Sequence, residues 1–194
     1  MSANKVEIRP SRAVRHLSSA MAAVGLVCFA LFVLTLSSGV YPGLSAEWTA
    51  AALGIKPWTS AEYPLWRLCA ALWRQLPFGS AAWRLNLSSA VYGALAAVLL
   101  CRYVARWVYA QIRTDGKGNA QRESLVAVAS GVVAALLFGT GLTGWSAATR
   151  FHPGMFSLVL VLLAFSLHQD YLHRHDVSRL YALAFLCGIG AVET

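Results

Sequence analysis

The chain has 194 residues, of which 58% are hydrophobic and 12% are charged, and its formal net charge is +8. Soluble domains carry about 25% charged residues, so this composition excludes an ordinary soluble domain and indicates an integral membrane protein. On so hydrophobic a chain, the basic excess favours the orientation of helices in a bilayer over nucleic-acid binding. The four cysteines show no CxxC or metal-ligand spacing, so we expect neither a disulfide nor a metal site.

The first 16 residues are polar and basic, and we interpret them as a cytoplasmic tail. The stretch that follows, about 17–40, carries no charge and is long enough to cross a bilayer, for which about 20 apolar residues are needed. A cleaved signal peptide is the alternative interpretation, but its apolar region is about 7–15 residues long. The length of this run therefore favours an uncleaved anchor.

The rest of the chain continues as hydrophobic runs with short connections, one of which carries a turn signal at 115–118. The last run, 180–194, is too short for a comfortable span, and we expect the chain to be a fragment of a longer protein. The sequence thus predicts an all-α integral membrane protein with one membrane domain over 17–194. Besides the first, three spans are predicted, at about 85–108, 124–148 and 153–168.

The basic residues predict an orientation. With the N-terminus inside, inner segments hold eleven of the sixteen Lys and Arg residues and outer segments hold five. The positive-inside rule applies to short connections such as these. We therefore expect 41–84 to form an outer loop that faces the periplasm or a lumen.

This outer loop contains two predicted helices. The first begins near Ser45, a plausible N-cap, and stops at Gly54. The second covers 65–75 and places leucines on one face and two arginines on the opposite side. That pattern is typical of an amphipathic helix that lies flat in the membrane interface.

Few carboxylates are available for chemistry on the outer side. Of the eight in the chain, only Glu47, Glu62 and Glu193 reach that side in the predicted topology. Glu47 stands in the first turn of its helix, where a negative charge also suits the helix dipole. A catalytic base and a simple helix-start charge both remain open for Glu47, whereas Glu62 is expected to be solvated.

Candidate ligand-binding residues lie at the outer ends of the spans. Arg84 opens the second span and is followed by Asn86. The Arg84 guanidinium could hold a lipid phosphate or extend to the headgroups, and the residue types alone favour the second. Arg150 and His152 lie in the outer connection between the third and fourth spans and could project into the same site.

Several motifs carry a family resemblance. They are YPLW at 63–66, LPFG at 76–79, RLNLSSA at 84–90 and GWSAATRFHPG at 144–154. Their order resembles that of the bacterial multi-pass membrane family related to the eukaryotic transmembrane O-mannosyltransferase, within the GT-C glycosyltransferase superfamily.

The resemblance implies a GT-C-like N-terminal helical bundle with amphipathic interfacial helices in its first outer loop. It implies an enzyme of the bacterial inner membrane that moves a sugar from a polyprenyl-phosphate donor to a protein or surface-glycan acceptor on the extracytoplasmic face. Its partners would be the lipid-linked donor, membrane lipids and the acceptor, with no nucleic acid and no cofactor. On this interpretation Glu47 is catalytic, and the substrate-binding residues are Tyr63, Arg84, Asn86, Arg150 and His152.

The chain departs from the family pattern in three places. The usual Asp-Ser-Gly-Glu motif reads LSAE at 44–47, the usual His-Pro-Pro-Gly reads TSAE at 59–62, and His152 stands where many members carry an acidic residue. Two classes of function therefore stay open: a glycosyltransferase, and a non-catalytic membrane module of the same fold that binds lipid-linked sugar or a partner protein. A transporter is a weaker third, because no predicted span has an ionised residue in its middle.

Overall fold

The computed structural model describes residues 12–58, 62–113 and 119–193. Within these ranges all regular structure is helical and no strand is formed, which confirms the prediction of an all-α protein. Most of the predicted tail, the turn at 115–118 and residues 59–61 of the TSAE motif lie outside the described residues. The described helices are α1 (Arg12–Leu34), α2 (Leu44–Ala52), α3 (Pro64–Arg74), α4 (Ala81–Ile112), α5 (Ala120–Thr140), α6 (Leu142–Ala148), α7 (Pro153–Arg174) and α8 (Val177–Val192).

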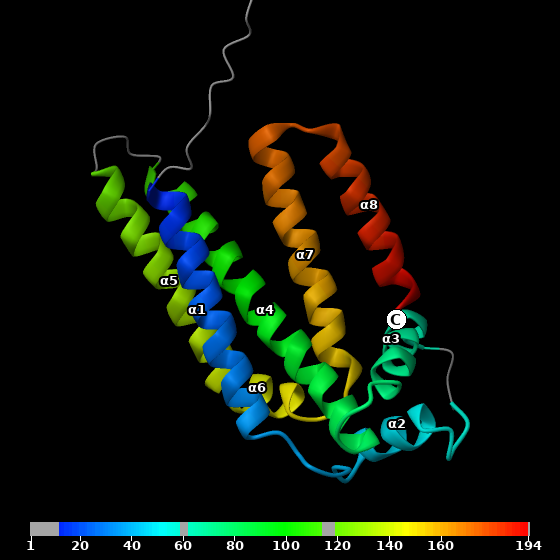
Figure 1. Cartoon of the computed structure of the whole chain (residues 1–194). Coiled ribbons are helices and arrows are strands. Elements are labelled where there is room, and N and C mark those ends of the chain that lie inside the picture. Colours follow the sequence, from blue (N-terminus) through cyan, green and yellow to red (C-terminus); the bar gives the residue numbers. More distant parts are fainter. Residues whose placement is uncertain (1–11, 59–61, 114–118, 194) are drawn as a thin grey trace, which may run out of the picture.

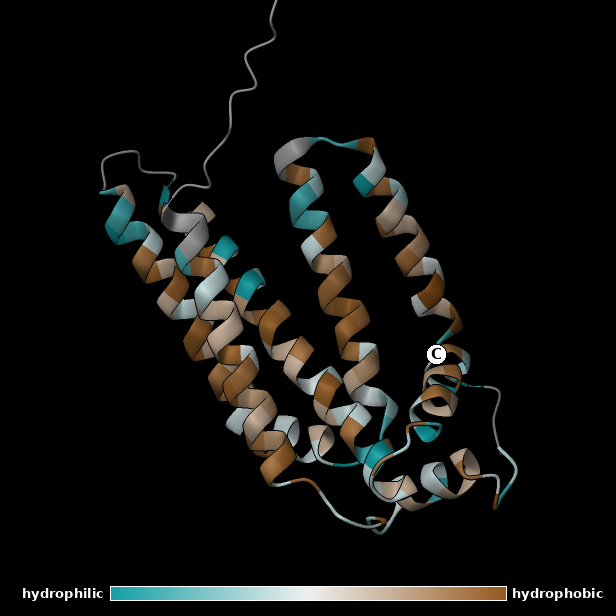
Figure 2. Cartoon of the chain, viewed as in Figure 1, coloured by the Kyte–Doolittle hydropathy of each residue, from teal (hydrophilic) through white to brown (hydrophobic). Residues whose placement is uncertain are grey.

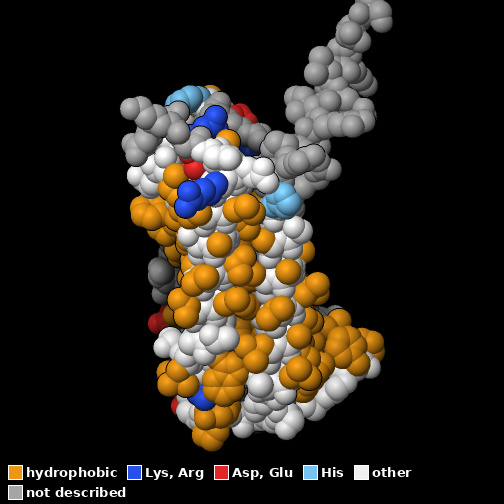
Figure 3. All heavy atoms as spheres, turned by 90° about the vertical axis from the view of Figure 1, so that its left-hand side faces the viewer, with side chains coloured by type: hydrophobic (Ala, Val, Ile, Leu, Met, Phe, Trp, Pro, Cys, Tyr) orange, Lys and Arg blue, Asp and Glu red, His pale blue; other side chains and the backbone are white. Residues whose placement is uncertain are grey.

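Four of the described helices are long and apolar enough to cross a membrane. Figure 2 shows hydrophobic ribbon along the middle of these helices and hydrophilic ribbon towards their ends. In Figure 3, hydrophobic side chains cover the body of the bundle, and most basic side chains in view gather near one end. The chain is therefore a multi-pass membrane protein. The candidate spans are His16–Leu34, Ala81–Ile112, Ala120–Thr140 and Pro153–Leu172.

Helix α4 is the centre of the bundle, since it packs against α1, α5 and α7 and also against α3 and α6. Much of its buried surface consists of alanine, serine and glycine. At Gly131 of α5, an added Cβ would lie 2.4 Å from the backbone oxygen of Cys101 on α4. Small residues of this kind allow helix backbones to approach closely in a membrane.

Helix α8 is 16 residues long and has no buried residue within it. It begins at Val177, three residues before the predicted run. Its first turn is held by an ion-pair cluster: the buried carboxylate of Asp170 on α7 pairs with Arg102 and Arg106 of α4 and with Arg179 of α8. The Arg102 and Arg179 contacts are both 2.9 Å long.

The other end of α8 is held by a second polar contact. Glu193 follows α8 and is buried, with 3% of its surface exposed. Its carboxylate accepts hydrogen bonds from the backbone N–H groups of Leu65 and Trp66 in the first turn of α3. These amides have no partner within their own helix, so Glu193 both caps α3 and fixes the end of α8.

Helices α2, α3 and α6 lie together at one end of the bundle, where α1 ends and α4 begins (Figure 1). The two helices predicted in the outer loop are confirmed, each within about two residues. The predicted N-cap of the first is wrong: Gly43, with φ 91°, precedes the helix, and Ser45 is buried inside its first turn. A glycine accepts this backbone conformation without strain, so the helix is capped two residues earlier than the serine indicated.

The third span is shorter than its hydrophobic run. Helix α5 ends at Thr140 because Gly141 adopts an extended conformation, and the chain then continues as α6. Helix α6 therefore belongs to the layer at the end of the bundle, together with α2 and α3.

Candidate functional site

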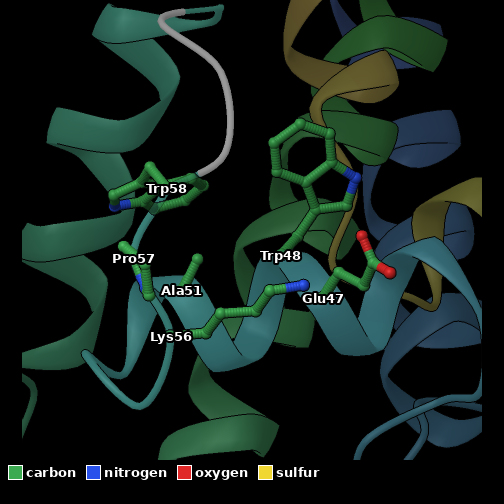
Figure 4. Close-up of a pocket in the computed structure, with 6 residues that line it drawn as sticks. All are labelled: Glu47, Trp48, Ala51, Lys56, Pro57 and Trp58. Atoms are coloured by element: carbon green, nitrogen blue, oxygen red, sulfur yellow. The ribbon is translucent and has the colours of Figure 1, made fainter.

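Glu47 lies in the first turn of α2, with its side chain exposed. Gly54, at φ 78°, reverses the chain after α2 and brings Lys56 and Trp58 back beside this helix. In Figure 4 the Lys56 side chain runs along α2 towards Glu47. A carboxylate, an ammonium group and two indole rings thus border one small recess, lined by Glu47, Trp48, Ala51, Lys56, Pro57 and Trp58.

A cluster of aromatic side chains packs beside this recess. The ring centroid of Trp48 lies 5.9 Å from that of Trp58, 5.8 Å from that of Tyr63 and 5.5 Å from that of Trp66. Trp66 is 1% exposed and stacks on Phe151 at 4.5 Å. Aromatic pairs contribute about 0.5–1.5 kcal/mol each beyond the area they bury. The cluster therefore joins α2, α3 and the connection before α7 into one support for Glu47.

Asn86 connects three segments at the end of the bundle where α4 begins. Its side chain is 1% exposed. The Nδ2 group donates to the carbonyl oxygens of Ser37 and Gly39, at 2.9 and 3.0 Å, and Oδ1 accepts from the backbone N–H of Phe151 at 2.9 Å. The amide thus has three internal partners, and it fixes the segment after α1 and the connection before α7 against α4.

The two candidate arginines make internal contacts. Arg84 Nη1 lies 3.3 Å from the carbonyl oxygens of both Phe78 and Gly79. The guanidinium carbon of Arg150 lies 3.4 Å from the ring centroid of Tyr41. Neither arginine forms an ion pair with Glu47 in the described part of the chain.

His152 is the N-cap residue of α7. Its Nδ1 atom accepts a hydrogen bond from the backbone N–H of Gly154 at 2.9 Å, and its own backbone N–H donates to Ser89 Oγ at 3.3 Å. Burial lowers the pKa of His152, because the charged imidazolium loses its solvation. The imidazole is therefore neutral at pH 7, and its accepting nitrogen caps the helix.

The structure brings the six predicted residues together only in part. Asn86, Arg150 and His152 meet at the start of α7, since Asn86 bonds the residue between the other two. Glu47 and Tyr63 meet through Trp48. Arg84 contacts the turn at 78–79 instead.

Sequence reasoning missed the part that Lys56 and Trp58 play in the recess, and it also missed the place of Arg67. The guanidinium carbon of Arg67 lies 4.5 Å from the ring centroid of Trp58. The arginine face of the helix at 65–75 and the end of the first helix at Gly54 were both predicted from the sequence. Nothing in the sequence showed that they would face each other.

These features first define a class: an all-helical multi-pass membrane protein with a layer of short helices at one end of its bundle. The family described as Protein O-mannosyl-transferase TMEM260 N-terminal domain matches residues 45–193. The chain belongs to this family, which confirms the resemblance seen in its motifs and places it among O-mannosyltransferase-like glycosyltransferases. The match covers α2 through α8 and all six predicted site residues.

Comparison with curated proteins found no match, and comparison with solved structures found none either.

Proposed function

We propose that the protein transfers a sugar from a polyprenyl-phosphate donor to a protein or surface-glycan acceptor, with Glu47 as the catalytic base. The observation that carries the proposal is the exposed Glu47 carboxylate in a recess with Lys56 and two indole rings, inside the family-matched region. We place the reaction on the extracytoplasmic face of a bacterial inner membrane, with the N-terminus in the cytoplasm. The eleven-to-five distribution of basic residues supports this orientation.

The chemistry of the transfer fits these side chains. The acceptor hydroxyl oxygen forms a bond to the anomeric carbon, and the bond from that carbon to the phosphate oxygen breaks with its electron pair leaving on the phosphate. Glu47 takes the hydroxyl proton, as a general base does. The Lys56 ammonium offsets the negative charge that develops on the leaving phosphate. Polyprenyl phosphate and the glycosylated acceptor are the products.

Glu47→Gln tests this role. The substitution keeps the size of the side chain and removes the base, so sugar transfer should fall by about 10²–10⁴-fold. The assay is transfer from a lipid-linked donor in membranes that carry the full-length protein. The matched control is Glu62→Gln, which changes another exposed glutamate of the same outer segment and should leave transfer unchanged. Normal transfer by the Glu47→Gln variant removes Glu47 from the mechanism.

A non-catalytic module of the same fold is the second candidate. It is favoured by the departure at Leu44, which stands where the family pattern has Asp and whose side chain is 64% exposed. If the protein is such a module, the wild type should bind lipid-linked sugar but transfer none. Measured turnover by the wild type decides between the two.

A further inference from the structure

The five basic residues of the predicted outer segments divide into two groups. Arg84 and Arg150 contact backbone carbonyls and the Tyr41 ring. The other three, Lys56, Arg67 and Arg74, line one open recess between α2 and α3. Three of the five outer cations therefore gather in a single place.

No acidic side chain lines this recess among the described residues. Apart from the cations, its walls are alanines of α2 and α3, Gly54, Pro57 and the indole of Trp58. Like charges held together repel each other, and a concave site lined by one sign of charge concentrates the opposite ion. The recess is therefore complementary to an anion.

The two arginines are held in position before any anion arrives. Arg74 Nη1 donates to the carbonyl oxygen of Ala52 at 3.1 Å, and the Arg67 guanidinium is placed against the Trp58 ring. Guanidinium groups suit phosphate because their donors match its oxygens in geometry and charge. Lys56 supplies a third cation, and its side chain is exposed.

The position of α3 indicates which phosphate compounds can reach the recess. Leu68 and Leu72 are 59% and 60% exposed and lie on a different face of α3 from Arg67 and Arg74. An amphipathic helix with such a face sits at the boundary between headgroups and acyl chains. The cations beside it would then lie at the depth of a lipid phosphate.

We propose that Lys56, Arg67 and Arg74 form the site for the phosphate group of the lipid-linked sugar donor. The identity of the lipid rests on the proposed function, whereas the anion site rests on the recess itself. Lys56 lines both recesses and so lies between the phosphate site and Glu47. This arrangement assigns donor binding to α2 and α3, with Glu47 reserved for the acceptor hydroxyl.

Binding of polyprenyl phosphate to the full chain in lipid nanodiscs tests the site. Lys56→Gln and Arg74→Gln should each weaken binding by about tenfold or more, the usual effect of removing one charge-assisted contact. Lys56→Arg should retain it, and added salt should weaken it because the cations are partly exposed. The matched control is Arg113→Gln, which removes an exposed arginine at the far end of α4 and should leave binding unchanged.

Two further probes separate the sources of the phosphate. Phosphatidylglycerol and inorganic phosphate should bind more weakly than polyprenyl phosphate and should lose less on Lys56→Gln. Equal losses for all three probes overturn the assignment to the donor, and unchanged binding of polyprenyl phosphate by Lys56→Gln overturns the site. Since Lys56 is exposed, its substitution should not unfold the chain, and a thermal unfolding scan checks this.

The same variants keep this proposal distinct from the role of Glu47. Glu47→Gln should bind polyprenyl phosphate normally while losing transfer. If Lys56→Gln loses binding and Glu47→Gln keeps transfer, the phosphate site stands and the catalytic role fails. If Glu47→Gln loses transfer and Lys56→Gln binds normally, the catalytic role stands and the phosphate site is overturned.

Discussion

At the scale of single residues, Asn86 shows how one buried amide organises one end of a membrane bundle. Its three hydrogen bonds join the segment after α1 and the connection before α7 to α4. A buried polar group left without its partner costs about 1–3 kcal/mol. The residue therefore supports the site from within, and its role could be read only once its partners were known.

Replacement of Asn86 by alanine should destabilise the protein by roughly 2–4 kcal/mol, because two carbonyl groups and the Phe151 N–H lose their buried partner. Thermal unfolding of the purified protein in detergent measures the loss. The control is Gln121→Ala at an exposed position of α5, which should change stability by less than about 0.5 kcal/mol. An unchanged midpoint for Asn86→Ala would contradict the bonding scheme.

Burial of His152 makes the folding stability of the protein depend on pH, and it fixes the sign of that dependence. Its pKa is lowered in the folded protein, whereas in the unfolded chain it titrates near about 6.5. The unfolded state therefore binds more protons below that pH, and folding stability falls as the pH drops from neutral towards the folded-state pKa.

His152→Asn should flatten this dependence, since asparagine is a good N-cap that does not titrate in this range. The measurement is the unfolding temperature from pH 7.5 to pH 5.0 for both proteins. His168→Asn, at an exposed position, serves as the control and should leave the wild-type slope unchanged. A slope retained by His152→Asn would show that other groups cause it.

The candidate site was predictable from sequence only where one residue type was scarce. Glu47 stood out because few carboxylates reach the outer side in the predicted topology, and the structure shows its side chain exposed beside a recess. The Arg84 guanidinium, for which a lipid phosphate or the headgroups are the predicted partners, also contacts two carbonyls of a turn. Such contacts depend on the path of the loop, which residue spacing does not encode.

At the scale of elements, hydrophobic length and periodicity predicted the helices well. The four candidate spans and the two helices of the outer loop all form. Helix ends were harder, because glycines at 43 and 141 move them through backbone conformation. Glu193 shows a further limit: a carboxylate 128 residues away caps α3, and no local pattern predicts such a partner.

Helix α3 is predicted to lie in the membrane interface with its leucine face towards the lipid. Spin labels at Leu68 and Leu72, in a variant without the native cysteines, should collide more with oxygen than with a water-soluble nickel complex. A label at Arg74 should show the reverse. Replacing either leucine by serine should weaken insertion by about 1.5–3 kcal/mol, the value of burying one such side chain. Labels at Leu68 and Leu72 that favour the nickel complex would place this face in water.

At the scale of the whole molecule, the two ends of the bundle carry different arrangements of charged side chains. One end holds the cluster of Arg102, Arg106 and Arg179 around Asp170. The other holds α2, α3 and α6, with Glu47 and the recess lined by three cations. The positive-inside rule predicts that the first end faces the cytoplasm, because the segments at that end hold eleven of the sixteen basic residues in the predicted topology.

This orientation predicts the labelling of two single-cysteine variants in intact cells. Ile55→Cys, at a position that is 77% exposed beside α2, should react with a membrane-impermeant maleimide. Asn119→Cys, exposed at the start of α5, should react only after the membrane is permeabilised. Parent protein without cysteines gives the background.

The opposite labelling pattern would have consequences beyond topology. It would place Glu47 and the Lys56, Arg67 and Arg74 recess on the cytoplasmic side, where an acceptor on the cell surface cannot reach them. The proposed transfer on the outer face would then fail, whatever the Glu47→Gln variant did. The anion recess would remain as a physical feature, but the inner segments would then hold five of the sixteen basic residues and the outer segments eleven, against the positive-inside rule.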